Sequence, residues 1–95
     1  MVKHDKRQGV YLIVAGNRLY IGSVAGKHRS FSARWNEHTT AIERGNHPND
    51  ALRGVDSKTL RFIPLAIVRR GDIATARRIE AILIKAIGGL CNERR

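Results

Sequence analysis

Five residues of this chain carry side chains that could together hydrolyse a phosphodiester bond. They are Tyr11, Tyr20, Arg34, His38 and Glu80. A phenol or an imidazole can orient or deprotonate water, a guanidinium can stabilise the charge of a transition state, and a carboxylate can hold a divalent metal ion. Each residue type is common by itself, so the elements that position these side chains decide whether they form a site.

The stretch GVYLIVAGNRLYIG, residues 9–22, predicts a β-hairpin. Gly16 and Asn17 are residue types that tolerate the positive φ of a tight turn. We therefore expect two strands, over residues 9–15 and 18–23, joined by a two-residue loop.

This hairpin would place both tyrosines on one face of the sheet. With a two-residue loop, Tyr11 pairs with Gly22, and Tyr11 and Tyr20 project from the same side. Gly22 would leave space beside Tyr11. The opposite face is predicted to be the core face, formed by Val10, Leu12, Val14, Leu19 and Ile21. A three-residue loop would exchange the faces, and two ordinary β-forming tyrosines are the alternative to a functional pair.

A helix predicted over residues 31–44 carries the cation and the imidazole. Ser30 is expected to cap it and Gly45 to end it. At about 100° per residue, Phe31, Trp35, His38 and Ile42 fall on one stripe, with Arg34 one turn before His38. A histidine on an apolar face is more often a hydrogen-bonded core residue than a catalyst, and Arg34 could simply be solvated. The sequence leaves these alternatives open.

The rest of the chain predicts a third strand and a last helix. Residues 59–68 are rich in β-branched and aliphatic side chains, and Pro64 places them at a sheet edge or a bulge. Residues 49–53 could form a short helical piece. Asp72 is expected to cap the last helix, which Gly88 and Gly89 would end.

Glu80 interrupts the apolar side of that last helix. The predicted apolar arc comprises Ile73, Ala76, Ile79, Leu83, Ala86 and Ile87, and Glu80 falls inside it. A carboxylate on a buried face costs several kcal/mol unless a cation, a metal or hydrogen-bond donors compensate it. Pairing with an arginine and binding a metal ion are both compatible with this position.

Charge indicates the kind of partner. The chain of 95 residues has 18 Lys and Arg against 8 Asp and Glu, a net charge of +10, which favours a polyanionic partner. We expect residues 1–8 to form a flexible basic N-terminus and residues 9–95 to form one domain. The residues predicted to contact backbone phosphates are Lys27, His28 and Arg29 in one loop, and Arg69 and Arg70 in a second; solvated basic loops are the alternative.

Membranes and disulfides are not expected. No apolar run reaches the roughly 18 residues of a spanning helix, and nothing resembles a signal peptide, so we expect a cytoplasmic protein without a membrane partner. The single Cys91 cannot form an internal disulfide and is expected to be a buried thiol.

The order of these motifs resembles the GIY-YIG nuclease family over nearly the whole chain. The matching segments are Gly9-Val10-Tyr11, Tyr20-Ile21-Gly22, Arg34 with His38, Glu80, and Asn92 near the C-terminus. Val10 stands where the signature has isoleucine. The resemblance implies an α+β fold, a small three-stranded antiparallel sheet flanked by helices in the order β-β-α-α-β-α. It also implies one Mg²⁺ or Mn²⁺ ion held by Glu80.

The resemblance implies roles for individual residues as well. Tyr11 would activate the attacking water and Tyr20 would assist by hydrogen bonding. Arg34 would stabilise the pentacovalent phosphate, and His38 would act as or support the general base. The residues expected to support the site or to touch substrate are Gly22, His47, Asn49 and Asn92.

The expected activity is that of a metal-dependent endonuclease that cuts DNA one strand at a time. A basic nucleic-acid-binding adaptor that does not cut, or a subunit of a repair or mobile-element complex, is the alternative. A weak homodimer or a larger complex would be compatible with either, and paired cuts would need a symmetric dimer or two encounters.

Overall fold

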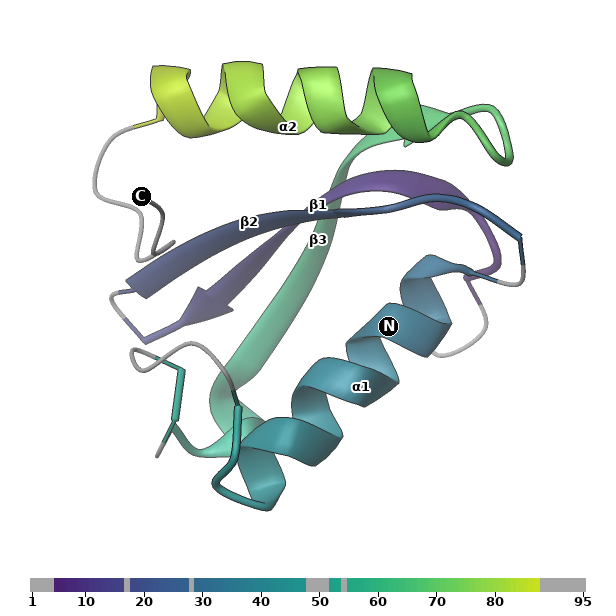
Figure 1. The fold of residues 1–95 in the computed structure, drawn as a ribbon. Coiled ribbons are helices and arrows are strands. Elements are labelled where there is room, and N and C mark those ends of the chain that lie inside the picture. The colour runs from purple at the N-terminus through teal and green to yellow at the C-terminus, as the bar shows by residue number, and fades with distance from the viewer. Residues whose placement is uncertain (1–4, 17, 28, 48–51, 54, 88–95) are drawn as a thin grey trace.

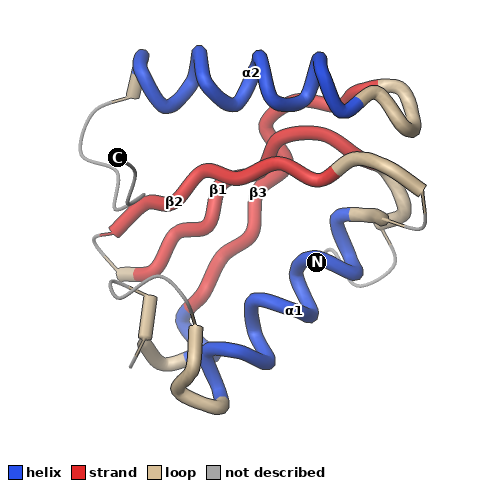
Figure 2. The backbone as a smooth tube through the Cα atoms, in the orientation of Figure 1, coloured by secondary structure: helices blue, strands red, loops and turns tan. Residues whose placement is uncertain are grey.

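The fold is a three-stranded antiparallel sheet with a helix on each side. The computed structural model describes residues 5–16, 18–27, 29–47, 52–53 and 55–87. The strands are β1 (Gln8–Ala15), β2 (Arg18–Val24) and β3 (Leu60–Val68), in the spatial order β2-β1-β3. The helices are α1 (Phe31–Glu43) and α2 (Ile73–Ala86), with a short 3-10 helix, η1 (Ser57–Thr59), before β3. Figures 1 and 2 show α1 and α2 on opposite sides of the sheet, which confirms the predicted α+β class.

The register of the β1–β2 hairpin is the predicted one. Tyr11 pairs with Gly22, Ile13 with Tyr20, and Ala15 with Arg18. Gly16 has a φ of 64°, the left-handed conformation that a tight turn requires and that glycine adopts without a steric penalty. Both tyrosines therefore project from the same face.

The prediction that only the other face is a core face is wrong. Tyr11 is 1% exposed, and it packs with Ile13, Val24 and Phe31 in a buried cluster between the sheet and α1. On the other face, toward α2, Val10 and Ile21 are also fully buried. With a helix on each side, each helix covers one face with its apolar stripe, so residues on both faces of β1 and β2 are buried.

The N-terminal boundary also differs from the prediction, because β1 begins at Gln8 rather than Gly9. The Gln8 side chain is 1% exposed. Its amide Nε2 donates to the carbonyls of Gly26 and Arg29, at 2.6 and 2.9 Å, and its Oε1 accepts from the backbone of Gly71 at 2.8 Å. Gln8 therefore ties two loops to the sheet and does not belong to a flexible end.

Strand β3 lies at a sheet edge, as Pro64 predicts. The register of β3 against β1 shifts between Val10 and Tyr11, where Pro64 stands opposite Tyr11. At this bulge the backbones approach closely, because a Cβ at Gly9 would lie 1.9 Å from the carbonyl oxygen of Ala66. Only glycine fits there.

The helix caps are as predicted. Ser30 Oγ accepts from the backbone of Ala33 at 3.1 Å, and Asp72 accepts from the backbone of Thr75 at 3.1 Å. Helix α1 ends at Glu43, two residues before Gly45, whose φ is 73°. The helical piece predicted over 49–53 and the glycines predicted to end α2 fall largely or wholly outside the described residues.

Helix α2 buries a narrower stripe than the predicted arc. Ala76 is its only fully buried residue, whereas Ile73 at one border of the arc is 44% exposed and Ala86 at the other is exposed too. A single helix lying on a small sheet contacts it along one line, so the borders of a wide apolar arc stay in water. None of the helices within the described part of the chain is long and apolar enough to cross a membrane.

Candidate active site

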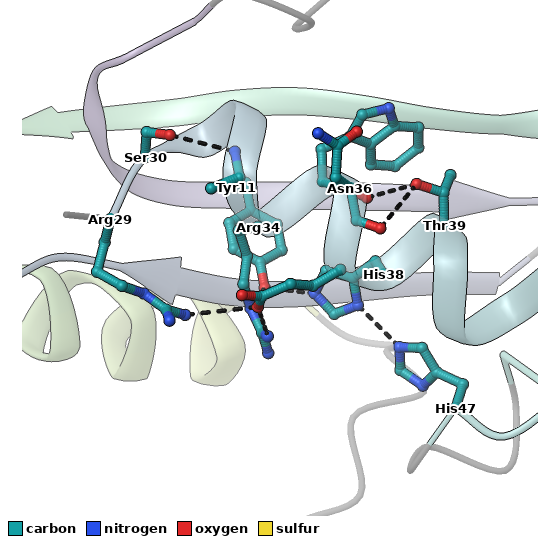
Figure 3. A network of polar contacts seen from close by, with 11 residues as sticks. Tyr11, Arg29, Ser30, Arg34, Asn36, His38, Thr39 and His47 are labelled. Atoms are coloured by element: carbon teal, nitrogen blue, oxygen red, sulfur yellow. Dashed lines mark hydrogen bonds and ion pairs between the residues drawn. The ribbon is translucent and has the colours of Figure 1, made fainter.

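Tyr11 is the centre of a buried polar network (Figure 3). Its hydroxyl oxygen lies 2.7 Å from Nε2 of His38 and accepts a hydrogen bond from Nε of Arg34 at 3.3 Å. Its ring stacks on Phe62, with ring centroids 4.8 Å apart. Strand β1 and helix α1 thus bring three of the five predicted catalytic residues into direct contact.

Gly22 makes room for this phenol. A Cβ at Gly22 would lie 2.3 Å from the Tyr11 hydroxyl oxygen and 2.5 Å from the ring carbon that carries it. Real Cβ atoms do not approach so closely, so the phenol can lie across β2 only because residue 22 has no side chain. The predicted space beside Tyr11 is confirmed.

His38 continues the network to His47. The Nδ1 atom of His38 lies 2.8 Å from Nε2 of His47, and both residues are 3% exposed. The two rings are nearly parallel, at 18°, with centroids 5.0 Å apart. Tyr20 packs edge-on against His38 and His47, at centroid distances of 5.6 and 6.5 Å. His47 and Tyr20 therefore join the site as the sequence predicts.

Burial keeps the central groups neutral. Burial, together with the charge of Arg34 and the neighbouring His47, lowers the pKa of His38 to about 3. Burial also raises the pKa of Tyr11 well above its ordinary value, although Arg34 opposes this effect. At neutral pH the site holds a neutral phenol beside a neutral imidazole.

A neutral imidazole has one N–H and one lone pair, so two hydrogen-bond directions fit these distances. In one, the Tyr11 hydroxyl donates to His38 Nε2, and His38 Nδ1–H donates to His47. In the other, His47 donates to His38 and His38 donates to Tyr11, whose own proton then points elsewhere. In both directions the Tyr11 oxygen accepts from Arg34.

Arg34 divides its guanidinium between Tyr11 and an acidic residue. Its Nη1 donates to Oε1 of Glu37 at 2.6 Å, and the same carboxylate oxygen lies 3.5 Å from Nη2 of Arg29. Glu37 stands one helical turn after Arg34, a spacing at which ion pairs form, so the helical spacing in the sequence is itself a signal for this contact.

Glu80 approaches the site from the other face of the sheet. Its Oε1 accepts a hydrogen bond of 2.6 Å from the hydroxyl of Ser23, the residue after Gly22 on the edge strand β2. Besides burial, which is the main cause, the charge of Glu80 also raises the pKa of Tyr11. The site therefore straddles β2, with Tyr11 crossing it on the α1 side and Glu80 meeting it on the α2 side.

Glu80 is half-buried rather than fully buried, and within the described part of the chain it makes no ion pair with an arginine. No group of three or more histidine, cysteine, aspartate or glutamate side chains that could hold a metal ion occurs among the described residues.

The predicted phosphate contacts have different surroundings. Lys27, Arg29 and Arg69 are exposed. Arg70 is also exposed, but its guanidinium donates to the backbone carbonyls of Lys6 at 2.7 Å and Arg29 at 3.4 Å, so it holds two segments together. His28, Asn49, Cys91 and Asn92 lie outside the described residues.

Comparisons with known proteins found no match. The chain matches no protein-family model, no curated protein and no solved structure. The resemblance to GIY-YIG nucleases therefore rests on the motif residues and on their spacing.

Proposed function

We propose that the protein is a metal-dependent endonuclease that hydrolyses phosphodiester bonds in DNA, of the GIY-YIG type. One observation carries the proposal: the Tyr11 hydroxyl contacts Arg34 and His38 at once, in a space that only Gly22 leaves open. Buried tyrosines do not need a guanidinium and an imidazole at the same oxygen in order to fold. Such an arrangement suits proton transfer next to a phosphate.

The Tyr11–His38 contact supports a proton relay. As the attacking water gives up a proton to the Tyr11 oxygen, the phenolic proton passes to the lone pair of His38 Nε2. The Nδ1 proton of His38 can then shift toward His47, 2.8 Å away. The low pKa of His38 disfavours the charged ring, but a bound phosphate would add negative charge nearby and raise that pKa.

Arg34 is suited to stabilise the charge of the transition state. A guanidinium offers several N–H donors in a planar arrangement that matches phosphate oxygens. Nε already bonds to Tyr11, so this cation would couple the base to the phosphate. Since Nη1 is bonded to Glu37, an incoming phosphate would compete with that carboxylate.

Glu80 fits a hard divalent ion. A carboxylate oxygen is the ligand that Mg²⁺ and Mn²⁺ favour, and Mg²⁺ often uses one or two carboxylates plus substrate phosphate oxygens and water. The Ser23 hydrogen bond fixes Oε1, and no described residue occupies the second oxygen. When bound, the ion would neutralise charge on the phosphate and on the leaving oxygen.

The test is cleavage of supercoiled, linear duplex and single-stranded DNA with Mg²⁺, with Mn²⁺ and with a chelator. We expect metal-dependent cleavage by the wild type. Glu80→Gln should abolish it while DNA affinity stays equal or rises, because one negative charge is lost. Glu43→Gln is the matched control, since Glu43 also accepts from a serine, Ser57, but is exposed on α1.

Three other results would contradict the proposal in different ways. Cleavage by Glu80→Gln at the wild-type rate would remove the metal-binding role of Glu80. Equal loss in both glutamate variants would indicate a general effect of charge. Binding of DNA without cleavage in any metal would identify the protein as a nucleic-acid-binding adaptor instead.

A further inference from the structure

Two hollows lie on either side of Arg29. The first, of about 240 Å³, is lined by Ser23, Arg29 and Arg77 together with apolar residues of β2, of the loop after it and of α2. The second, of about 450 Å³, is lined by Lys6, Arg29 and Arg70 together with residues from the start of α1. No acidic residue lines either hollow within the part of the chain that the structure describes. Both are therefore attractive to anions.

The backbone between the hollows is firmly held. The Arg29 carbonyl accepts from Gln8 Nε2 at 2.9 Å and from Arg70 at 3.4 Å. The second nitrogen of Arg70 donates to the Lys6 carbonyl at 2.7 Å. These contacts join the segments around residues 6, 29 and 70, which are far apart in the sequence, so the cations lie on a fixed surface.

The first hollow adjoins the candidate active site. Ser23 lines this hollow and donates its hydroxyl to Glu80, while Arg29 lies 3.5 Å from the carboxylate that pairs with Arg34. Arg77 stands on α2 three residues before Glu80, which is just under one helical turn. A strand whose phosphate reaches Arg34 would therefore pass directly over Arg29.

We propose that the two hollows bind the backbone phosphates that flank the cleaved one. Arg29 borders both hollows, Arg77 lines only the first, and Lys6 and Arg70 line only the second. The inference rests on the proposed function for the position of the cleaved bond. It implies that the cleaved phosphodiester lies inside a nucleic-acid strand, with a further phosphate on each side. An ester with a single phosphate would leave both hollows empty.

The first measurement is the affinity for duplex DNA as a function of salt, with a chelator present so that no strand is cut. Each lost phosphate contact lowers the salt slope by about one. We expect this decrease for Arg77→Ala and for Lys6→Ala. Arg78→Ala, which removes an exposed cation from the neighbouring position of α2, is the control and should keep the wild-type slope.

The second measurement is cleavage of duplex DNA and of a dinucleotide that has one phosphodiester. Arg77→Ala and Lys6→Ala should lower kcat/KM for duplex DNA but not for the dinucleotide. If both variants match Arg78→Ala in salt slope and in kcat/KM while the wild type cuts DNA, the proposal of flanking phosphate sites is wrong but the proposed nuclease activity is supported.

If the wild type cuts no substrate but the salt slopes fall as expected, the two hollows bind phosphate and the proposed nuclease activity is wrong.

Discussion

At the scale of single residues, the site brings together polar side chains that would each be hydrated separately in the unfolded chain. A phenol, an imidazole and a guanidinium meet at one oxygen, and burial keeps the first two neutral while Arg34 stays charged. The imidazole therefore stays neutral over the whole physiological pH range. Keeping it neutral has a measurable cost in stability at low pH.

The expected cost is a loss of stability as pH falls from about 6.5 toward 3. In this window the unfolded chain protonates His38 but the folded chain does not, so the unfolded state binds more protons and the free energy of unfolding decreases. One proton can contribute at most about 1.4 kcal/mol per pH unit. His38→Gln, which cannot titrate, should make this dependence shallower.

Denaturant unfolding at several pH values in the upper part of the window would measure the effect. In that part of the window the titration of these aspartates interferes least. Hydrogen bonding lowers the pKa of Asp5 and of Asp72 below their ordinary 3.8, so both carboxylates stay ionised there. Equal pH dependence in the wild type and in His38→Gln would show that His38 is not held neutral by the fold.

At the scale of elements, the β1–β2 hairpin sets the geometry of the site. Its two-residue turn fixes the register, and the register places Gly22 opposite Tyr11. The sequence predicted this pairing because turn length and strand alternation are local properties. It could not predict which helix would cover which face.

Gly22→Ala should disable the site more than it destabilises the fold. The added methyl group would meet the Tyr11 hydroxyl at 2.3 Å, so the phenol must leave its contact with His38. Overpacking of this kind typically costs about 1–3 kcal/mol. A displacement of about 1 Å at a catalytic group can lower the rate on the order of 100-fold.

Gly16→Ala in the same hairpin is the matched control. Its φ is 64° but nothing lies within 4 Å of the added methyl group, so it carries a backbone penalty without a clash. We expect DNA cleavage to survive in Gly16→Ala and to be lost in Gly22→Ala, measured beside the unfolding free energy of each. Wild-type cleavage by Gly22→Ala would mean that the Tyr11 position is not critical.

At the scale of the whole molecule, one site lies at the β2 edge of a small sheet on a chain with a net charge of +10. On the proposed function, this charge would attract DNA without selecting a sequence, because phosphate contacts carry no base information. One candidate site would then cut only one strand in one encounter.

Supercoiled DNA should therefore convert first to the nicked circle and only later to the linear form. Sampling the reaction over time on a gel measures the order, and the nicked species should accumulate at every protein concentration. Direct appearance of linear DNA, with a rate that rises steeply with protein concentration, would indicate a dimer that brings two sites to the duplex.

The sequence by itself determined the local features. The hairpin register, the caps Ser30 and Asp72, and the one-turn spacing of Arg34 and His38 all follow from short-range rules of turn chemistry and helical period. The structure reproduces each of them. The contact between Tyr11 and His38, which are 27 residues apart, joins two residues that the resemblance assigned to one site.

Only the tertiary structure decided how the faces are covered and where the last helix lies. Burial depends on which element packs against which, so no local rule showed that the face carrying the tyrosines is a core face. Nor did a local rule show that Glu80 of α2 bonds to Ser23 of the edge strand β2. The same holds for the hollows around Arg29, whose cations come from segments distant in the sequence. Such contacts are non-local, and the chain must fold before they exist.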